Sequence, residues 1–199
     1  MNRSRFRRAV VLIDQANAAD PQWESWQGQK YPRTYLYGIR MTEWLLKLYP
    51  EAPETAFLAA RAQHVCRWLV PRARYPAGRQ GYLEWRTFLY RLHADKAAQL
   101  LAAAGYGEAA IDQVRRILLK RGLRRDPQVQ MVEDTACLVF LRFHFVPFAE
   151  GYREEKLVDI VRKTWRKMSP RARQAALALP LEGRAAVLVQ RVLEGRKRP

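Results

Sequence analysis

Residues 81–107 have the sequence GYLEWRTFLYRLHADKAAQLLAAAGYG, and this stretch decides the fold. Apolar residues recur in it at spacings of three and four, the period of one face of a helix, and glycine closes the stretch. The spacing predicts one long amphipathic helix whose apolar stripe contains Leu89, His93, Ala97, Leu100 and Ala104. We therefore expect His93 to point toward the core. A histidine there is either a hydrogen-bonded core residue or part of a site.

The remaining sequence shows the same helical period in most places and no regular strand pattern. The predicted helices cover residues 4–17, 32–48, 54–70, 109–121, 127–150, 154–167, a segment from 169 onward, and 181–193. The segment 127–150 is the most apolar, and we expect it to be the buried central helix. A length of 199 residues with 49% hydrophobic content suits one core. The prediction is an all-α fold of about nine helices in a single domain, with a basic first helix and a frayed basic tail at 195–199.

The charge is strongly positive, with 36 Lys and Arg against 19 Asp and Glu, a formal net charge of +17. Such a balance favours an anionic partner such as RNA, DNA, the ribosome or an acidic membrane surface. A compositional bias that leaves a solvated basic surface is the alternative. The sequence has no apolar run near the roughly 18 residues of a membrane span, and its two cysteines do not form a disulfide framework. We expect a cytoplasmic protein without a membrane partner.

Three polar residues are predicted to point inward from three helices: His64, His93 and Asp134. Two imidazoles and a carboxylate suit one divalent metal ion (Mn, Fe, Zn or Mg), which could activate water against a phosphoester. Because these ligands come from separate helices, the spacing forms no local motif. Three buried polar residues also occur in many protein cores.

Three short segments resemble the HD-domain phosphohydrolase superfamily in order and helical spacing: AARAQH at 59–64, LHADKAAQLLAAAG at 92–105 and VEDTACL at 132–138. The resemblance spans about residues 35–141 and implies a helical, HD-like domain with a metal-dependent activity. The chain departs from the pattern at two ligand positions, where it has Tyr37 and Val65. The resemblance therefore implies one metal at most, or a degenerate pocket in which Tyr37, Gln63 and arginines replace the metal.

The whole chain resembles more closely an uncharacterised group, the domain-of-unknown-function family number four thousand two hundred and two. The motifs are YLYGIRMTEWLLKLYP, AARAQHVCRW, YPAGRQGYLEWR, DPQVQMVEDTACLVFL and EEKLVDIVRKTWRKM. This resemblance implies a family but no established activity.

Arginines near the predicted site are candidates for binding phosphate. Arg61 and Arg67 lie three residues before and after His64, and Arg86 lies seven residues before His93. Such a clamp would position and neutralise a phosphoester. The alternative is that these arginines form salt bridges with acidic residues such as Glu43, Glu84 or Asp134.

Three functions follow from these features. The leading hypothesis is a protein that binds a nucleotide or RNA phosphoester in a basic pocket and hydrolyses it with one metal. The second is a non-catalytic RNA- or ribosome-binding protein on a decayed HD scaffold. The third is a protein–protein adaptor whose charge is only compositional.

Overall fold

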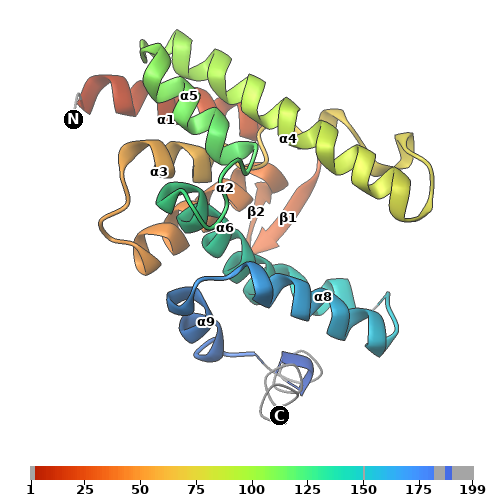
Figure 1. Ribbon diagram of the computed structural model, residues 1–199. Helices are drawn as coiled ribbons and strands as arrows, with labels where there is room; N and C mark the ends of the chain where they lie inside the picture. Colours follow the sequence, from red (N-terminus) through yellow and green to blue (C-terminus); the bar gives the residue numbers. More distant parts are fainter. Residues whose placement is uncertain (1–2, 150, 182–186, 190–199) are drawn as a thin grey trace. The chain divides into compact units, whose positions relative to one another are not determined.

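The computed structural model describes residues 3–149, 151–181 and 187–189 (Figure 1). The chain divides into two compact units, Met1–Val132 and Glu133–Pro199. Helices dominate both units, and one short hairpin supplies the only strands in the described ranges, so the all-α prediction is confirmed. The prediction that residues 1–199 form one HD-like domain stays a prediction. No helix in the described part is long and apolar enough to cross a membrane.

The first unit is built on five α-helices that pack against one another. They are α1 (Arg3–Ala18), α2 (Arg33–Leu48), α3 (Glu54–Arg61), α4 (Gly78–Ala103) and α5 (Glu108–Leu118), with short 3-10 helices η1 (Arg67–Leu69) and η2 (Arg72–Arg74). α1 packs against α2, α3 and α4, while α5 packs against α3 and α4. This arrangement gives α4 a buried face toward two neighbouring helices.

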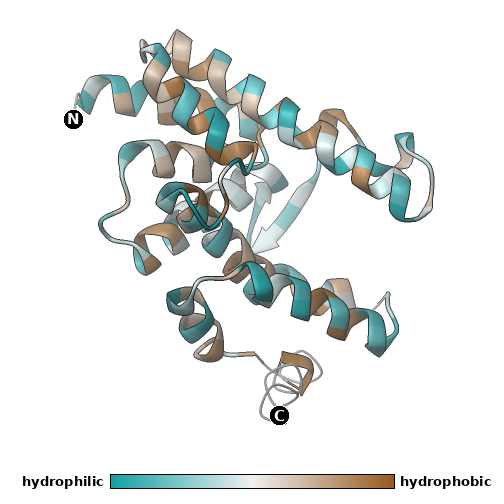
Figure 2. Ribbon diagram, in the orientation of Figure 1, coloured by the Kyte–Doolittle hydropathy of each residue, from teal (hydrophilic) through white to brown (hydrophobic). Residues whose placement is uncertain are grey.

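The long helix predicted from residues 81–107 is α4, which begins three residues earlier, at Gly78, and ends at Ala103. Leu89, His93 and Ala97 are buried as predicted, and the stripe continues through Leu101 rather than Leu100. Gly105 follows with a φ of +89°, a left-handed conformation that glycine adopts without strain. Figure 2 shows hydrophilic and hydrophobic residues alternating along α4, as a helix with one buried face requires.

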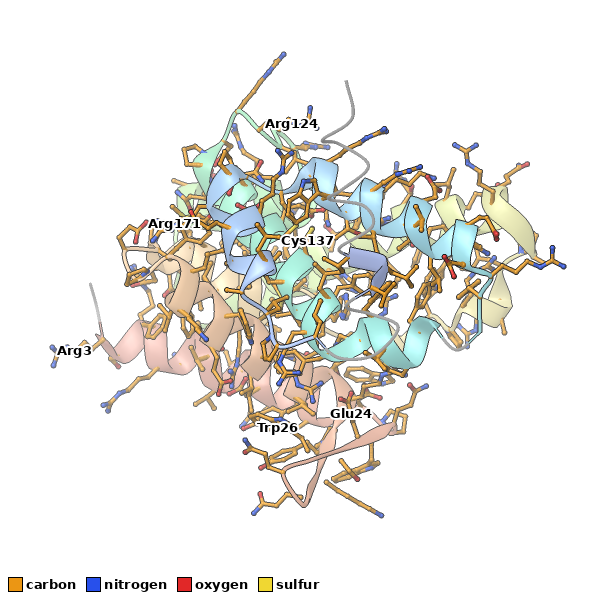
Figure 3. The ribbon with its side chains drawn as sticks, turned by 90° about the horizontal axis from the view of Figure 1, so that it is seen from below. Arg3, Glu24, Trp26, Arg124, Cys137 and Arg171 are labelled. Carbon is orange, nitrogen blue, oxygen red and sulfur yellow. The ribbon has the colours of Figure 1, made fainter. Side chains whose placement is uncertain are left out.

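The segment between the predicted helices 4–17 and 32–48 contains an antiparallel hairpin, which the sequence pattern did not indicate. Strands β1 (Trp23–Trp26) and β2 (Gln29–Pro32) pair with Trp26 opposite Gln29, and the turn residues Gln27 and Gly28 both have positive φ. Glu24 and Trp26 project from β1 (Figure 3) and contact Arg40: Glu24 Oε1 lies 2.5 Å from Arg40 Nη1, and the Arg40 guanidinium lies 5.6 Å from the Trp26 ring centroid. The hairpin thus covers a buried arginine of α2.

The helix predicted over residues 54–70 is wrong beyond Arg61, where α3 ends. The Arg61 carbonyl accepts a hydrogen bond from Asn17 Nδ2 of α1, at 3.2 Å. The N–H of Val65, which would continue the helix at that carbonyl, donates instead to Ala62. Cys66 then adopts a left-handed φ of +58°. A contact with α1 therefore accompanies the change from helix to turn, and His64 lies in that turn rather than on a helix face.

The second unit contains the helical residues after Val132. α6 (Pro127–Val139) spans the boundary between the units and continues into a π-helical segment, η3 (Phe140–His144), and then α7 (Phe145–Ala149). The predicted helix at 127–150 is thus largely confirmed, and residues 132–139 are buried except for Ala136. α8 (Glu154–Lys167) has the predicted bounds, and α9 (Pro170–Leu177) begins after Ser169, whose hydroxyl caps it.

The last predicted helix, 181–193, falls mainly outside the described residues. The described residues 187–189 within it are helical. The predicted frayed tail at 195–199 also lies outside them.

Candidate anion-binding site

Two of the three predicted metal ligands lie together in the first unit. The ring centroids of His64 and His93 are 5.7 Å apart, at an interplanar angle of 47°. Tyr37 of α2 stacks on His64, with its ring 3.8 Å from that of His64 and nearly parallel to it. Thus α2, the turn after α3, and α4 each supply one ring.

His93 is deeply buried and incompletely hydrogen-bonded. Only 3% of the residue is exposed, and its Nε2 has no hydrogen-bond partner. Burial, together with the nearby charges of Arg67 and Lys120, lowers the pKa of His93 to about 3. The imidazole is therefore neutral near pH 7, with one ring nitrogen unused by the fold.

The third predicted ligand, Asp134, belongs to the second unit. It is fully buried, and its Oδ1 accepts a hydrogen bond from the backbone N–H of Ser169, at 2.8 Å. This contact gives the carboxylate a structural role at the start of α9.

The ligand chemistry falls short of a complete metal site. Among the described residues, no group of three or more His, Cys, Asp or Glu side chains is arranged to hold a metal ion. Catalytic zinc sites use three protein ligands, and the His64–His93 pair supplies two. The histidine pair by itself therefore does not complete a catalytic metal site.

Arg67 of η1 is a partly buried cation without an acidic partner in the described part of the chain. Its guanidinium lies 4.6 Å from the centroid of the Trp85 ring. Burial lowers its pKa, and Arg33 and Arg86 lower it further, although Tyr37 and Tyr82 act in the opposite direction. Within the described ranges no carboxylate forms an ion pair with Arg67. Burying a charge in this way is unfavourable unless an opposite charge offsets it.

Two more cations contact Tyr90, another aromatic residue of α4. The Arg86 guanidinium lies 5.4 Å from the Tyr90 ring centroid, and its Nε donates to the Tyr90 hydroxyl. Lys120 Nζ lies 5.2 Å from the same centroid. We define the basic cluster as Arg33, Arg67, Arg86 and Lys120, which lie around His93 and the rings of Tyr37, Tyr82, Trp85 and Tyr90.

Arg61, the other arginine predicted beside His64, is bound within the fold. Its Nε and Nη2 donate to the two carboxylate oxygens of Asp14, at 2.6 and 2.8 Å, and its Nη1 donates to Thr42 Oγ1, at 3.0 Å. This bidentate pair connects α1, α2 and α3. Arg61 therefore has a structural role and is not part of the basic cluster.

Several residues of the cluster were missed from the sequence. Lys120 comes to the site because it follows α5, which packs on α4. Tyr82 could have been found, since it lies four residues before Arg86 and eleven before His93, on the same helical face. Arg33 and Trp85 showed no local signal.

An open depression of about 540 Å³ lies elsewhere in the first unit, between α5 and the start of α6. It is lined by Gln113, Arg116, Gly122, Arg125, Asp126, Pro127 and Gln128. None of these residues belongs to the basic cluster. The depression is therefore separate from the side chains around His64 and His93.

Comparison with known proteins identifies the family of this chain. The model of a family described as a domain of unknown function (DUF4202) matches residues 7–189. The chain therefore belongs to the DUF4202 family. No curated protein and no solved structure matches it.

Proposed function

We propose that this DUF4202 protein binds a phosphoester, of a nucleotide or RNA, at the basic cluster. The observation that carries the proposal is Arg67, a partly buried guanidinium with no acidic partner among the described residues. Nearby Arg33 and Arg86 add like charge instead of compensating it. A bound anion would supply the missing negative charge.

The chemistry of the cluster suits phosphate in particular. A guanidinium presents a planar fork of donors that matches phosphate oxygens in a bidentate geometry. His93 is neutral near pH 7, and its buried Nε2 has no hydrogen-bond partner within the fold. A neutral imidazole can accept or donate at this nitrogen, depending on its tautomer.

Titration calorimetry with inorganic phosphate and with adenosine monophosphate tests the proposal. Loss of a hydrogen bond to a charged group is worth about 1.5–3 kcal/mol, so we expect Arg67→Ala to weaken binding roughly 10- to 100-fold. Arg8→Ala is the matched control, because Arg8 is an exposed arginine of α1 outside the cluster. Equal affinities in wild type and Arg67→Ala would refute the proposal.

Hydrolysis with one divalent metal is the second candidate function. It is favoured by the 5.7 Å separation of the His64 and His93 rings and by the unpartnered Nε2 of His93. Such a metal would act as a Lewis acid toward a phosphoester, and its remaining ligands would come from outside this histidine pair. This candidate function assumes descent from the HD-domain phosphohydrolase superfamily. The resemblance of residues 59–64, 92–105 and 132–138 to that superfamily supports the assumption.

Metal analysis of the purified protein decides between binding and hydrolysis. The catalytic version predicts a stoichiometric metal that His64→Ala and His93→Ala each remove. A metal-free wild type without phosphatase activity in added Mn²⁺ would leave the non-catalytic version. That version gains support from Tyr37, whose ring covers one face of His64.

A cytoplasmic location is consistent with Cys66 and Cys137, which form no disulfide.

A further inference from the structure

We infer that the phosphoester is part of a single-stranded nucleic acid, which runs from the basic cluster onto the N-terminal half of α4 and the loop before it. We call this surface the α4 platform and define it by Arg74, Tyr75, Arg79, Tyr82 and Phe88. The inference rests on the proposed function and names its ligand class. Figure 1 shows the N-terminal half of α4 extending beyond α5.

The charge of this segment is strongly one-sided. Residues 67–91 contain six arginines and one acidic residue, Glu84, which accepts a hydrogen bond from Gln80. Arg79 is exposed and forms no ion pair in the described part of the chain. Arg74 donates to the carbonyl of Leu69, at 3.1 Å, a contact that leaves its positive charge uncompensated. The platform therefore favours a polyanion.

Exposed aromatic rings lie among these arginines. Tyr82 is 42% exposed and Phe88 is 46% exposed. Tyr75 lies beside Phe88, with ring centroids 6.4 Å apart, and Tyr82 lies beside Trp85, at 6.1 Å. Aromatic faces next to arginines are the features with which proteins bind single strands, because each unpaired base can stack on a ring.

The loop is held in place on α4. Trp85 Nε1 donates to the carbonyl of Val70, at 2.8 Å, and Arg72 donates to the carbonyls of Tyr75, Pro76 and Gly78. Gly81 brings the backbones together, since a Cβ there would lie 2.1 Å from the Pro76 oxygen. The arginines and rings are thus positioned before a ligand arrives, which reduces the entropy cost of binding.

Electrostatics and base accessibility select this occupant over its rivals. A second copy of the chain would bring the same positive segment against itself, which is unfavourable. A nucleic-acid duplex buries the faces of its bases within the stack, so Tyr82 and Phe88 would gain nothing from it. A single strand provides both phosphates for the arginines and free base faces for the rings.

Fluorescence anisotropy with labelled oligouridine and oligothymidine of about ten nucleotides, a length within the range of known single-strand sites, tests the inference. Base stacking is worth about 1–3 kcal/mol, so Tyr82→Ala and Phe88→Ala should each weaken binding roughly 5- to 100-fold. Leu46→Ala is the control, because Leu46 is a similarly exposed apolar residue of α2, at 44%. All three positions are on the surface, and circular dichroism checks that the variants fold.

The outcomes separate this inference from the proposed function. Weaker binding of either oligonucleotide by Phe88→Ala, with phosphate binding unchanged, supports it, because Phe88 lies outside the basic cluster, and the two probes distinguish RNA from DNA. The inference is wrong if the aromatic variants bind oligouridine and oligothymidine like wild type, or if a duplex competes equally well. Either result would leave the proposed function intact where Arg67→Ala still weakens phosphate binding. A change in oligomeric state on mutation, measured by sedimentation, would assign the face to self-association and also overturn it.

Discussion

In the sequence, Arg61 lies three residues before His64 and Arg67 lies three residues after it. In the structure the two arginines have different environments. At the junction of α1, α2 and α3, Arg61 is paired in bidentate fashion with Asp14 and donates to Thr42. In the basic cluster, Arg67 lies on the Trp85 ring near other cations, without an acidic partner in the described ranges. One arginine is thus paired within the fold, whereas the other carries a partly buried charge that no acidic side chain in the described ranges compensates.

The largest expected effect comes from breaking the Arg61 pair. Arg61→Met leaves Asp14 as an uncompensated, largely buried carboxylate, and we expect the free energy of unfolding to fall by about 3–5 kcal/mol. Urea denaturation measures the change. Arg115→Met is the control, since its ion pair with Asp95 is exposed and should contribute no more than about 1 kcal/mol. If both variants lose a similar amount of unfolding free energy, the Arg61–Asp14 pair contributes no more to stability than an exposed ion pair.

The next largest effect is the dependence of the free energy of unfolding on pH that results from the low pKa of His93. The pKa of His93 is about 3 in the folded state against 6.5 as a reference value, so the unfolded chain binds a proton at pH values where the folded chain does not. The corresponding stability is complete above about pH 6.5 and is lost as the pH falls toward 3. From pH 7 to pH 5 this amounts to roughly 2 kcal/mol.

Comparing His93→Gln with wild type at several pH values isolates this contribution. The variant should lose less stability than wild type on acidification from pH 7 to pH 5, whatever its stability at pH 7. Parallel pH profiles would show that His93 titrates normally in the folded protein, and the electrostatic description of the cluster would then be wrong.

The smallest expected effect is the loss of the Arg67 charge in the absence of ligand. Arg67→Met keeps an apolar stem against Trp85 and removes a cation that lies near Arg33 and Arg86. We expect the free energy of unfolding to stay within about 1 kcal/mol of wild type, or to rise, because no buried partner is left unpaired. Thermal and urea unfolding in phosphate-free buffer measure it. A loss as large as that of Arg61→Met would mean that Arg67 is also structural.

Local patterns predicted many of the helices. The apolar period of residues 81–107 predicted α4, and the pattern of residues 154–167 predicted α8 with its observed bounds. These predictions succeed because a helix face repeats over a few residues and is visible in the sequence. The end of α3 was not predictable in this way, since Asn17 of α1 occupies the carbonyl that the helix would have used.

The grouping of the side chains in the basic cluster was predicted in part. His64, His93 and the two arginines Arg67 and Arg86 were identified, and the structure places these four around one group of aromatic rings. The sequence could not distinguish the role of Arg61 from that of Arg67, because both residues are arginines three positions from His64. Their partners decide the difference, and Asp14 is 47 residues away from Arg61 in the sequence.

The sequence by itself determined the helical class, the long helix 81–107, the excess of positive charge and the inward position of His93. Only the tertiary structure decided which cations are compensated, because compensation depends on contacts between segments distant in the chain. It paired Arg61 with Asp14 and brought Lys120 to His93 by packing α5 on α4. Charge composition is a property of the residues, whereas an uncompensated charge is a property of their arrangement.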